Sequence, residues 1–224
     1  MRPMITNRVL VVCTANMIRS PFVAALLRTR LASGPGAVLD ISSAGTAARP
    51  GDAAADGVIE MGRTYGLSLD EHRTRRLDEG VLQTGDTVLC AERAHRRAVL
   101  DLRPDLISSV FTVREFARSV ETVTTAGGAG NWPALVQAAA RARSVERRGL
   151  DDDIVDPVGR PADVWLAFER EATWAVSTIL ASIASLPRID AEAAAQGFIP
   201  ATRREYRGMQ LAEPPAAPPA GWRS

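Results

Sequence analysis

Residues 11–21 read VVCTANMIRSP, in which a cysteine ends an apolar run and an arginine–serine pair follows it. The spacing of Cys13, Arg19 and Ser20 suits the hydrolysis of a phosphate ester. The attacking group in that chemistry is a thiolate, whereas an ordinary cysteine has a pKa of about 8.5 and needs help to ionise. A loop between a strand and a helix gives this help, because its backbone N–H groups converge on an anion and the helix N-terminus adds positive charge.

The side chains that follow Cys13 could complete a phosphate-binding loop. Arg19 can hold two phosphate oxygens in a bidentate fork. Ser20 can donate a hydrogen bond to the thiolate and ease its departure in the second step of hydrolysis. We therefore predict that Cys13 is a nucleophile. The alternative is that Cys13 packs as a small buried hydrophobe at the end of a strand.

The cysteine–arginine spacing alone is weak evidence in this chain. All 27 basic residues are arginine, which is about one residue in eight of the 224. A second match with the same spacing begins at Cys90, in CAERAHR. There Glu92 would place a carboxylate inside the anion-binding loop, and Arg97 stands where the serine should be. We therefore expect Cys90 to be a core residue.

The reaction also needs an acid that protonates the leaving oxygen. Asp156 is the candidate, because it lies in DDDIVDPVGRP at 151–161 and forms the only Asp-Pro pair in the sequence. Pro157 stiffens the backbone next to this carboxyl. The same acid could later activate water. The alternative is that the aspartates of this segment form a solvated acidic turn; their spacing is not that of a calcium loop.

Strands that alternate with helices must position these groups. This order predicts a parallel sheet with right-handed crossovers, and ligands of such sheets bind at the carboxyl ends of the strands, where Cys13 lies. We expect Ser20 at the N-cap of the first helix, with Pro21 in its first turn. The expected strands are 7–13, 38–43, 86–91 and 106–113, and the expected helices are 20–32, 53–65, 92–102 and 162–185, with a broken helical stretch at 114–150.

Length and composition fit an α/β domain with an appendage. Hydrophobic residues make up 46% of the chain, enough for a sizeable core, and the net charge of +1 gives no field that would attract nucleic acid or a membrane. No run approaches the roughly 18 apolar residues of a membrane span, and the N-terminal apolar segment is too short for a signal peptide. We expect a cytoplasmic protein whose two cysteines form no disulfide framework.

The character of the chain changes after about residue 187. The sequence ends in AEPPAAPPAGWRS, a Pro/Ala-rich composition that is typical of disordered segments. We therefore expect one domain at 1–187 and a partly disordered C-terminal extension at 188–224.

Four motifs occur in order along the chain: VVCTANMIRSP at 11–21, SSAGT at 42–46, DEHRTRRL at 70–77 and DIVDPVGRP at 153–161. In these motifs the chain resembles the low-molecular-weight protein tyrosine phosphatase family, over about residues 7–185. The resemblance implies a four-stranded parallel sheet with helices on both faces, in agreement with the pattern of elements. It also implies a phosphocysteine intermediate, a phosphorylated protein as substrate, and neither a metal nor another cofactor.

By this resemblance, Cys13 is the nucleophile, Arg19 the phosphate clamp, and Asp156 the general acid and then the general base. Ser43 and His72 match residues that support the family's phosphate loop. Without the resemblance, His72 would be interpreted as a surface histidine. The phosphate-binding residues that it implies are Thr14, Ala15, Asn16, Met17, Ile18, Arg19 and Ser20.

Three positions bear on substrate choice and redox control. Met17 matches a position near the substrate that often carries isoleucine in tyrosine phosphatases and threonine in phosphoarginine phosphatases, so its apolar side chain favours an aromatic substrate. Val158 follows Asp-Pro where tyrosine phosphatases usually present an aromatic residue, which argues against a preference for phosphotyrosine. Ile18 replaces a second loop cysteine, so the disulfide protection that such a cysteine gives is lost.

Three alternatives to a tyrosine phosphatase stay open. One is a phosphoarginine phosphatase. Another is an arsenate reductase on the same fold, which starts from the same thiolate and needs a second thiol, either Cys90 or an external small molecule. The third is a phosphoprotein-binding module that does not turn over its ligand.

Overall fold

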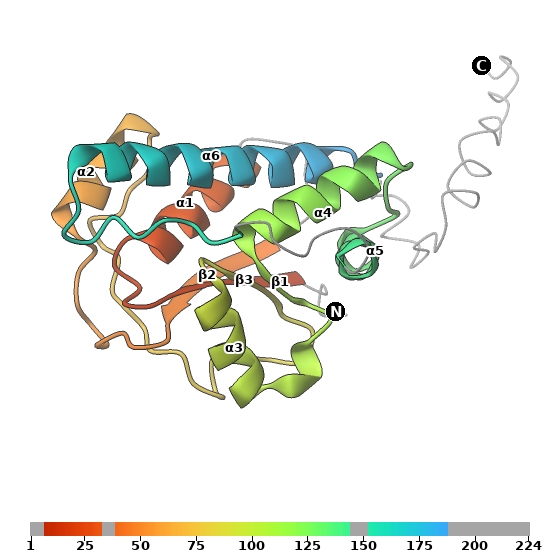
Figure 1. Cartoon of the computed structure of the whole chain (residues 1–224), viewed down its shortest axis with the longest axis horizontal. Helices are drawn as coiled ribbons and strands as arrows, with labels where there is room; N and C mark the ends of the chain where they lie inside the picture. The colour runs from red at the N-terminus through yellow and green to blue at the C-terminus, as the bar shows by residue number, and fades with distance from the viewer. Residues whose placement is uncertain (1–6, 33–38, 144–151, 188–224) are drawn as a thin grey trace, which may run out of the picture. The chain divides into compact units, whose positions relative to one another are not determined.

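A four-stranded parallel sheet forms the centre of the protein, as predicted (Figure 1). The structure is a computed structural model and describes residues 7–32, 39–143 and 152–187. The strands are β1 (Asn7–Cys13), β2 (Leu39–Gly45), β3 (Thr87–Cys90) and β4 (Val110–Thr112), in the spatial order β2-β1-β3-β4. All three strand pairs are parallel, so the carboxyl ends of the strands meet at one edge, where Cys13 pairs with Gly45.

Helices cover both faces of this sheet (Figure 1). The helices are α1 (Arg19–Ala32), α2 (Asp56–Thr64), α3 (Arg93–Leu102), α4 (Val113–Thr125), α5 (Trp132–Ala142) and α6 (Ala162–Ala184), with a short 3-10 helix, η1, at Pro104–Leu106. The residues that pack on one face come from α1, α2, α4, α5 and α6, and those on the other come mainly from α3, η1 and the loop before β3.

The valine-rich sequence of β1 is explained by burial on both faces. Val9 and Val11 contribute to the larger core beneath α1, α4 and α6, whereas Leu10 and Val12 contribute to the smaller core beneath α3. Because successive side chains of a strand point to opposite faces, an uninterrupted apolar run is needed to fill both cores.

Two local predictions are wrong. α1 begins at Arg19, and Ser20 lies inside its first turn with its hydroxyl towards Cys13, so Ser20 is not the N-cap residue. The predicted strand at 106–113 is shorter, because Pro104 begins η1 and β4 starts only at Val110.

The other element boundaries agree with the predicted pattern to within a few residues. Gly66 follows the last residues of α2 with a φ of 71°, the left-handed conformation that glycine adopts readily after a helix. The C-terminal extension at 188–224 lies outside the described residues. Within the described part of the chain, no helix has the length and apolar character needed to cross a membrane.

Candidate active site

The loop between β1 and α1 curves around the sulfur of Cys13. Asn16 has a φ of 57°, the left-handed region that asparagine tolerates better than most residues. This turn directs the backbone N–H of Asn16 towards the Cys13 Sγ atom, 3.3 Å away. The α1 N-terminus follows at once, so the loop has the geometry of an anion nest at a helix start.

The side chain of Asn16 ties this loop to its neighbours. Its Nδ2 donates hydrogen bonds to Ser20 Oγ and Ser43 Oγ, both at 2.9 Å. Its Oδ1 accepts a hydrogen bond from the backbone N–H of Arg75 at 2.9 Å, and its backbone carbonyl accepts one from His72 Nε2 at 2.8 Å. Ser43 and His72, the predicted supporting residues, thus lie against the loop; the contact from Arg75 was not predicted.

His72 contacts the loop as a donor, which requires a proton on Nε2. Burial lowers the pKa of His72 below 6.5, the hydrogen bond to the Asn16 carbonyl opposes this shift, and the nearby charges of Arg28 and Arg73 add to the lowering. The neutral imidazole can keep its Nε2 proton, so the hydrogen bond to Asn16 persists without a buried charge.

Gly45 allows the loop to pack directly on the end of β2. A Cβ atom at this position would lie 2.5 Å from the Thr14 carbonyl oxygen and 2.8 Å from the Asn16 nitrogen. Both distances are too short for a real side chain. Thr46 N then donates a hydrogen bond to Cys13 O at 2.9 Å. The glycine of the SSAGT motif is therefore needed for close backbone approach.

The hydroxyl of Ser20 lies next to the sulfur of Cys13. The Cys13 sulfur is buried and lies 3.0 Å from Ser20 Oγ. The hydroxyl oxygen of Ser20 accepts the hydrogen bond from Asn16, which leaves the hydroxyl proton for an acceptor. Two acceptors are within reach, the Cys13 sulfur and the Ala44 carbonyl at 3.3 Å. A charged thiolate is the stronger acceptor of the two.

Arg19 is almost completely buried, with 3% of its side chain exposed, and its charge is matched by two carboxylates. Its Nη1 lies 3.2 Å from Glu92 Oε2, and its Nη2 lies 2.7 Å from Asp156 Oδ2. The same guanidinium donates hydrogen bonds to Thr14 Oγ1 at 3.1 Å and to the Ile154 carbonyl at 3.4 Å. These partners fix the plane of the guanidinium beside the loop.

The structure brings Asp156 to the phosphate loop from the far end of the domain. Its side chain is 43% exposed, with Oδ2 on Arg19 and Oδ1 accepting a hydrogen bond from the backbone N–H of Val158 at 3.1 Å. The carboxyl is therefore held at two points and still reaches solvent. A general acid that later activates water needs both properties.

The segment that carries Asp156, residues 152–158, is called the acid loop below. Its backbone is anchored just beyond the end of β3, because Ile154 N donates a hydrogen bond to the carbonyl of Ala91, the residue after this strand, at 2.8 Å. Arg114 of α4 donates a hydrogen bond to the Asp153 carbonyl at 2.8 Å, and Asp152 is buried and pairs with Arg118. Asp152 is thus a buried anchor of the acid loop, whereas Asp156 stays partly exposed.

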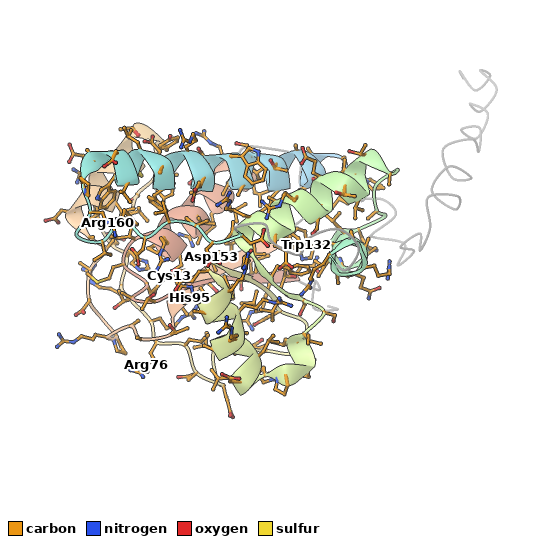
Figure 2. The ribbon with its side chains drawn as sticks, in the orientation of Figure 1. Cys13, Arg76, His95, Trp132, Asp153 and Arg160 are labelled. Atoms are coloured by element: carbon orange, nitrogen blue, oxygen red, sulfur yellow. The ribbon has the colours of Figure 1, made fainter. Side chains whose placement is uncertain are left out.

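Glu92 and His95 lie at the site, and the sequence did not predict either residue there. His95 Nε2 lies 2.9 Å from Thr14 Oγ1 and 3.2 Å from Glu92 Oε1. Figure 2 shows His95 on α3 near Cys13, whereas Trp132 of α5 lies apart from both. The signal in the sequence is the acid in CAERAHR: the same carboxylate that argues against Cys90 as a nucleophile is available to pair with Arg19.

Cys90 packs in the core, as predicted. Its side chain is completely buried beside Leu10 and Val12, on the sheet face covered by α3. Burial raises the pKa of the Cys90 thiol far above its ordinary value. Such a thiol is a poor nucleophile. Among the residues that the structure describes, no cluster of three or more His, Cys, Asp or Glu side chains could hold a metal ion.

The fold and the site define a class of protein that sequence comparison also identifies. Residues 8–125 match the sequence pattern described as low molecular weight phosphotyrosine protein phosphatase. The chain belongs to this family.

Relatives with related names cover different shares of the chain. A probable low molecular weight protein-tyrosine-phosphatase of Ralstonia solanacearum, EpsP, is 34% identical over 107 residues, which are 48% of this chain and 70% of EpsP. Etp of Escherichia coli K12, a low molecular weight protein-tyrosine-phosphatase, is 35% identical over 103 residues, 45% of this chain and 64% of Etp. A protein-arginine-phosphatase of Geobacillus stearothermophilus is 26% identical over 164 residues, 73% of this chain and 87% of that protein.

Solved structures extend the likeness beyond residue 125. A low molecular weight protein tyrosine phosphatase from T. tengcongensis superposes with a TM-score of 0.57 at 25% identity, and the match covers 78% of this chain and 97% of that one. The YwlE arginine phosphatase from Geobacillus stearothermophilus superposes with a TM-score of 0.55 at 25% identity, covering 77% and 89% of the two chains.

Proposed function

We propose that the protein hydrolyses phosphomonoesters on phosphorylated proteins, with phosphotyrosine as the preferred target and Cys13 as the nucleophile. The observation that carries this proposal is the placement of three groups. The Cys13 sulfur lies inside a nest-shaped loop, Ser20 Oγ lies 3.0 Å from it, and Arg19 is fixed beside the same loop. Thr14, Ala15, Met17 and Ile18 complete the phosphate-binding loop through their backbone N–H groups.

The first step transfers the phosphoryl group to sulfur. The Cys13 thiolate attacks phosphorus, an S–P bond forms, and the P–O bond to the leaving group breaks. Asp156 donates its proton to the leaving oxygen, which departs as an alcohol or phenol. Arg19 and the loop N–H groups stabilise the charge on the transferred phosphoryl oxygens.

The second step releases phosphate. The Asp156 carboxylate, left by the first step, accepts a proton from water, and the water oxygen bonds to phosphorus. The S–P bond breaks, and the Cys13 thiolate forms again. The hydroxyl of Ser20, whose oxygen accepts from Asn16, donates its proton in a hydrogen bond to the leaving sulfur and lowers the cost of this charge.

Substitution of the two cysteines tests the proposal. Cys13→Ser is expected to lower hydrolysis of a small aryl phosphate by at least about a thousandfold, because the residue supplies the nucleophile. Cys90→Ala is the matched control: it removes the other thiol from a buried position and is expected to lower stability by about 1 kcal/mol without loss of turnover. Loss of activity in Cys90→Ala alone would contradict the assignment. Tight binding of phosphate esters without turnover would instead indicate a phosphoprotein-binding module.

Phosphoarginine is the second candidate substrate. Val158 in the acid loop is 62% exposed and aliphatic, so this side of the entrance offers no aromatic ring on which a phosphotyrosine could stack. The Geobacillus relative named as an arginine phosphatase also aligns with a larger share of the chain than EpsP does. Turnover of matched phosphotyrosine, phosphoserine and phosphoarginine peptides decides between the candidates, and we expect phosphotyrosine to be hydrolysed fastest because Met17 is large and apolar.

We infer a cytoplasmic location and a phosphoprotein partner, in line with the composition and the family. The arsenate-reductase alternative loses its internal thiol, because Cys90 is completely buried on the other face of the sheet. It would then need an external thiol. Measurement of thiol oxidation that depends on added arsenate tests this alternative.

A further inference from the structure

A closed ring of four side chains links Arg19 to helix α3. Arg19 Nη1 lies 3.2 Å from Glu92 Oε2, and Glu92 Oε1 lies 3.2 Å from His95 Nε2. His95 Nε2 lies 2.9 Å from Thr14 Oγ1, which accepts a hydrogen bond from Arg19 Nη2 at 3.1 Å. We propose that Glu92 and His95 are positioning residues that hold the guanidinium of Arg19 in place to receive a phosphate group.

The carboxylate of Glu92 is free for this purpose because another residue caps α3. Glu92 stands at the N-cap of α3 with extended backbone angles, yet its side chain makes no capping hydrogen bond. Instead, Asp153 Oδ1 of the acid loop accepts the hydrogen bond from Arg93 N at 2.8 Å. The cap is therefore supplied from the acid loop, and the Glu92 side chain is directed to the arginine.

The contacts of His95 favour a proton on Nε2. This nitrogen lies 2.9 Å from Thr14 Oγ1 and 3.2 Å from Glu92 Oε1, and a proton on it suits both oxygens, because a hydroxyl oxygen can accept a hydrogen bond and a carboxylate can only accept. The other nitrogen, Nδ1, is buried with no hydrogen-bond partner within the described structure. The ring therefore contains a neutral imidazole that donates from Nε2, and the Thr14 hydroxyl accepts from both His95 and Arg19.

Burial keeps His95 neutral at ordinary pH. It lowers the pKa of His95 to about 4; the charge of Glu92 opposes this shift, and the charge of Arg19 adds to it. The charges of Asp153 and Asp156 also favour the charged imidazole. A neutral His95 matters for the ring, because an imidazolium would compete with Arg19 for the single carboxylate of Glu92.

A purely structural role explains these contacts less well. His95 is 3% exposed, and an apolar side chain of similar size would fill the same space without a buried unpartnered nitrogen, which costs free energy. A histidine at this position is explained if its imidazole helps to hold the guanidinium of Arg19. Of the two carboxylates on Arg19, Asp156 is the more exposed, at 43% against 30% for Glu92. An incoming phosphate can thus take the place of the Asp156 carboxylate on Arg19 while Glu92 stays in contact with the guanidinium.

The test measures phosphate binding separately from turnover, since the inference rests on the proposed function. Calorimetry on the Cys13→Ser protein gives the Kd of inorganic phosphate, and steady-state kinetics on the Cys13 protein gives KM and kcat. His95→Leu is expected to raise the phosphate Kd and the KM about tenfold, because a hydrogen bond in a charged network is lost. His95→Gln, whose amide can donate from a similar position, is expected to stay within about threefold.

Val99→Ala is the matched control, because Val99 is fully buried on the same helix and outside the ring. It should lower the Tm and leave the phosphate Kd unchanged. The inference is overturned if His95→Leu binds phosphate within twofold of its parent, if His95→Gln is as impaired as His95→Leu, or if Val99→Ala loses the same affinity. Should His95→Leu fail to fold, Thr14→Val opens the ring from the loop side, and an unchanged Kd there overturns the inference.

Failure of the proposed function has a different signature. In that case the Cys13 protein hydrolyses no phosphomonoester and the Cys13→Ser parent binds no phosphate, which overturns both ideas together. If the parent turns over substrate and binds phosphate while the His95 variants do the same, the positioning role alone is wrong.

Discussion

At the scale of single residues, the site depends on side chains that hydrogen bonds hold in place around the Cys13 sulfur. The Asn16 side chain fixes Ser20 and Ser43 at once, and His72 holds the Asn16 carbonyl from outside. The side chains of Asn16 and Ser20 and the carbonyl of Asn16 thus have partners within the protein. A loop built in this way keeps its N–H groups pointed inwards before a substrate arrives, which is the arrangement that electrostatic catalysis requires.

Gly45→Ala is expected to lower kcat/KM at least tenfold. The added Cβ would lie 2.5 Å from the Thr14 carbonyl oxygen and 2.8 Å from the Asn16 nitrogen, so the loop would have to move by a few tenths of an ångström or more. Gly85→Ala is the control: Gly85 has a φ of 90° and open space around it, so the change costs about 1 kcal/mol of stability without touching the loop. Equal kinetics for Gly45→Ala and the wild type would show that the loop does not need this close approach.

His95 makes the stability of the protein depend on pH. Its pKa is about 4 in the folded chain against 6.5 in the unfolded chain. Between these values the unfolded chain takes up a proton that the folded chain does not, so the free energy of unfolding falls as the pH drops from about 6.5 to 4. Burial lowers the pKa of His72 too, which acts in the same direction.

Replacement of His95 by glutamine should therefore reduce the loss of Tm between pH 7 and pH 5, measured by thermal unfolding. His72 remains in this variant, so part of the pH dependence is expected to remain. Parallel Tm profiles for His95→Gln and the wild type would contradict the buried, neutral state of His95.

At the scale of elements, the acid loop is held by helices that are distant in sequence. Arg114 of α4 donates a hydrogen bond to the Asp153 carbonyl and lies 3.5 Å from Glu171 of α6. Glu171 in turn accepts a hydrogen bond from Val155 N at 3.0 Å. The position of Asp156 is thus set by the packing of α4 against α6, and not by the loop sequence alone.

Arg114→Leu is expected to loosen the acid loop and impair proton donation. Hydrolysis of alkyl phosphates, which need a proton on the leaving oxygen, should fall more than tenfold, and hydrolysis of aryl phosphates with acidic leaving groups much less. A series of leaving groups measures this as a steeper dependence of kcat on leaving-group pKa. Arg63→Ala removes an arginine from an exposed ion pair with Asp70 and should leave the series unchanged.

This arrangement also decides what could be predicted from the sequence. The strand β1 and the amphipathic helices could be predicted from the sequence, because burial on both faces gives a continuous apolar run and a helix with one buried face gives a periodic pattern. The Cys13–Ser20 spacing and the Asp-Pro pair located the nucleophile and acid candidates. The contribution of Asp153 to α3 was not readable, because it depends on a helix start that only the tertiary fold brings near. The same holds for Glu92, whose local pattern pointed away from the site.

At the scale of the whole molecule, the described core extends to the last helix of the domain predicted at 1–187. The last helix, α6, buries Phe168, Val176, Ile179 and Ile183 in the main core, and it ends at Ala184. The described residues that form the candidate site lie between Cys13 and Val158. We therefore propose that the extension at 188–224 is dispensable for folding and for hydrolysis of small substrates.

A chain that ends at residue 187 should keep a Tm within about 3 °C of the full chain and the same kcat/KM on an aryl phosphate, because it retains the whole of α6 with its buried side chains. A chain that ends at residue 177 is the matched contrast. It loses Ile179 and Ile183, which are 1% and 2% exposed, and removal of two large buried side chains costs about 4 kcal/mol or more, a large share of the stability of a domain. If the chain that ends at residue 187 is unfolded at the temperature of the assay, the domain boundary lies beyond residue 187. A selective loss of activity on phosphopeptides would assign the extension to substrate binding.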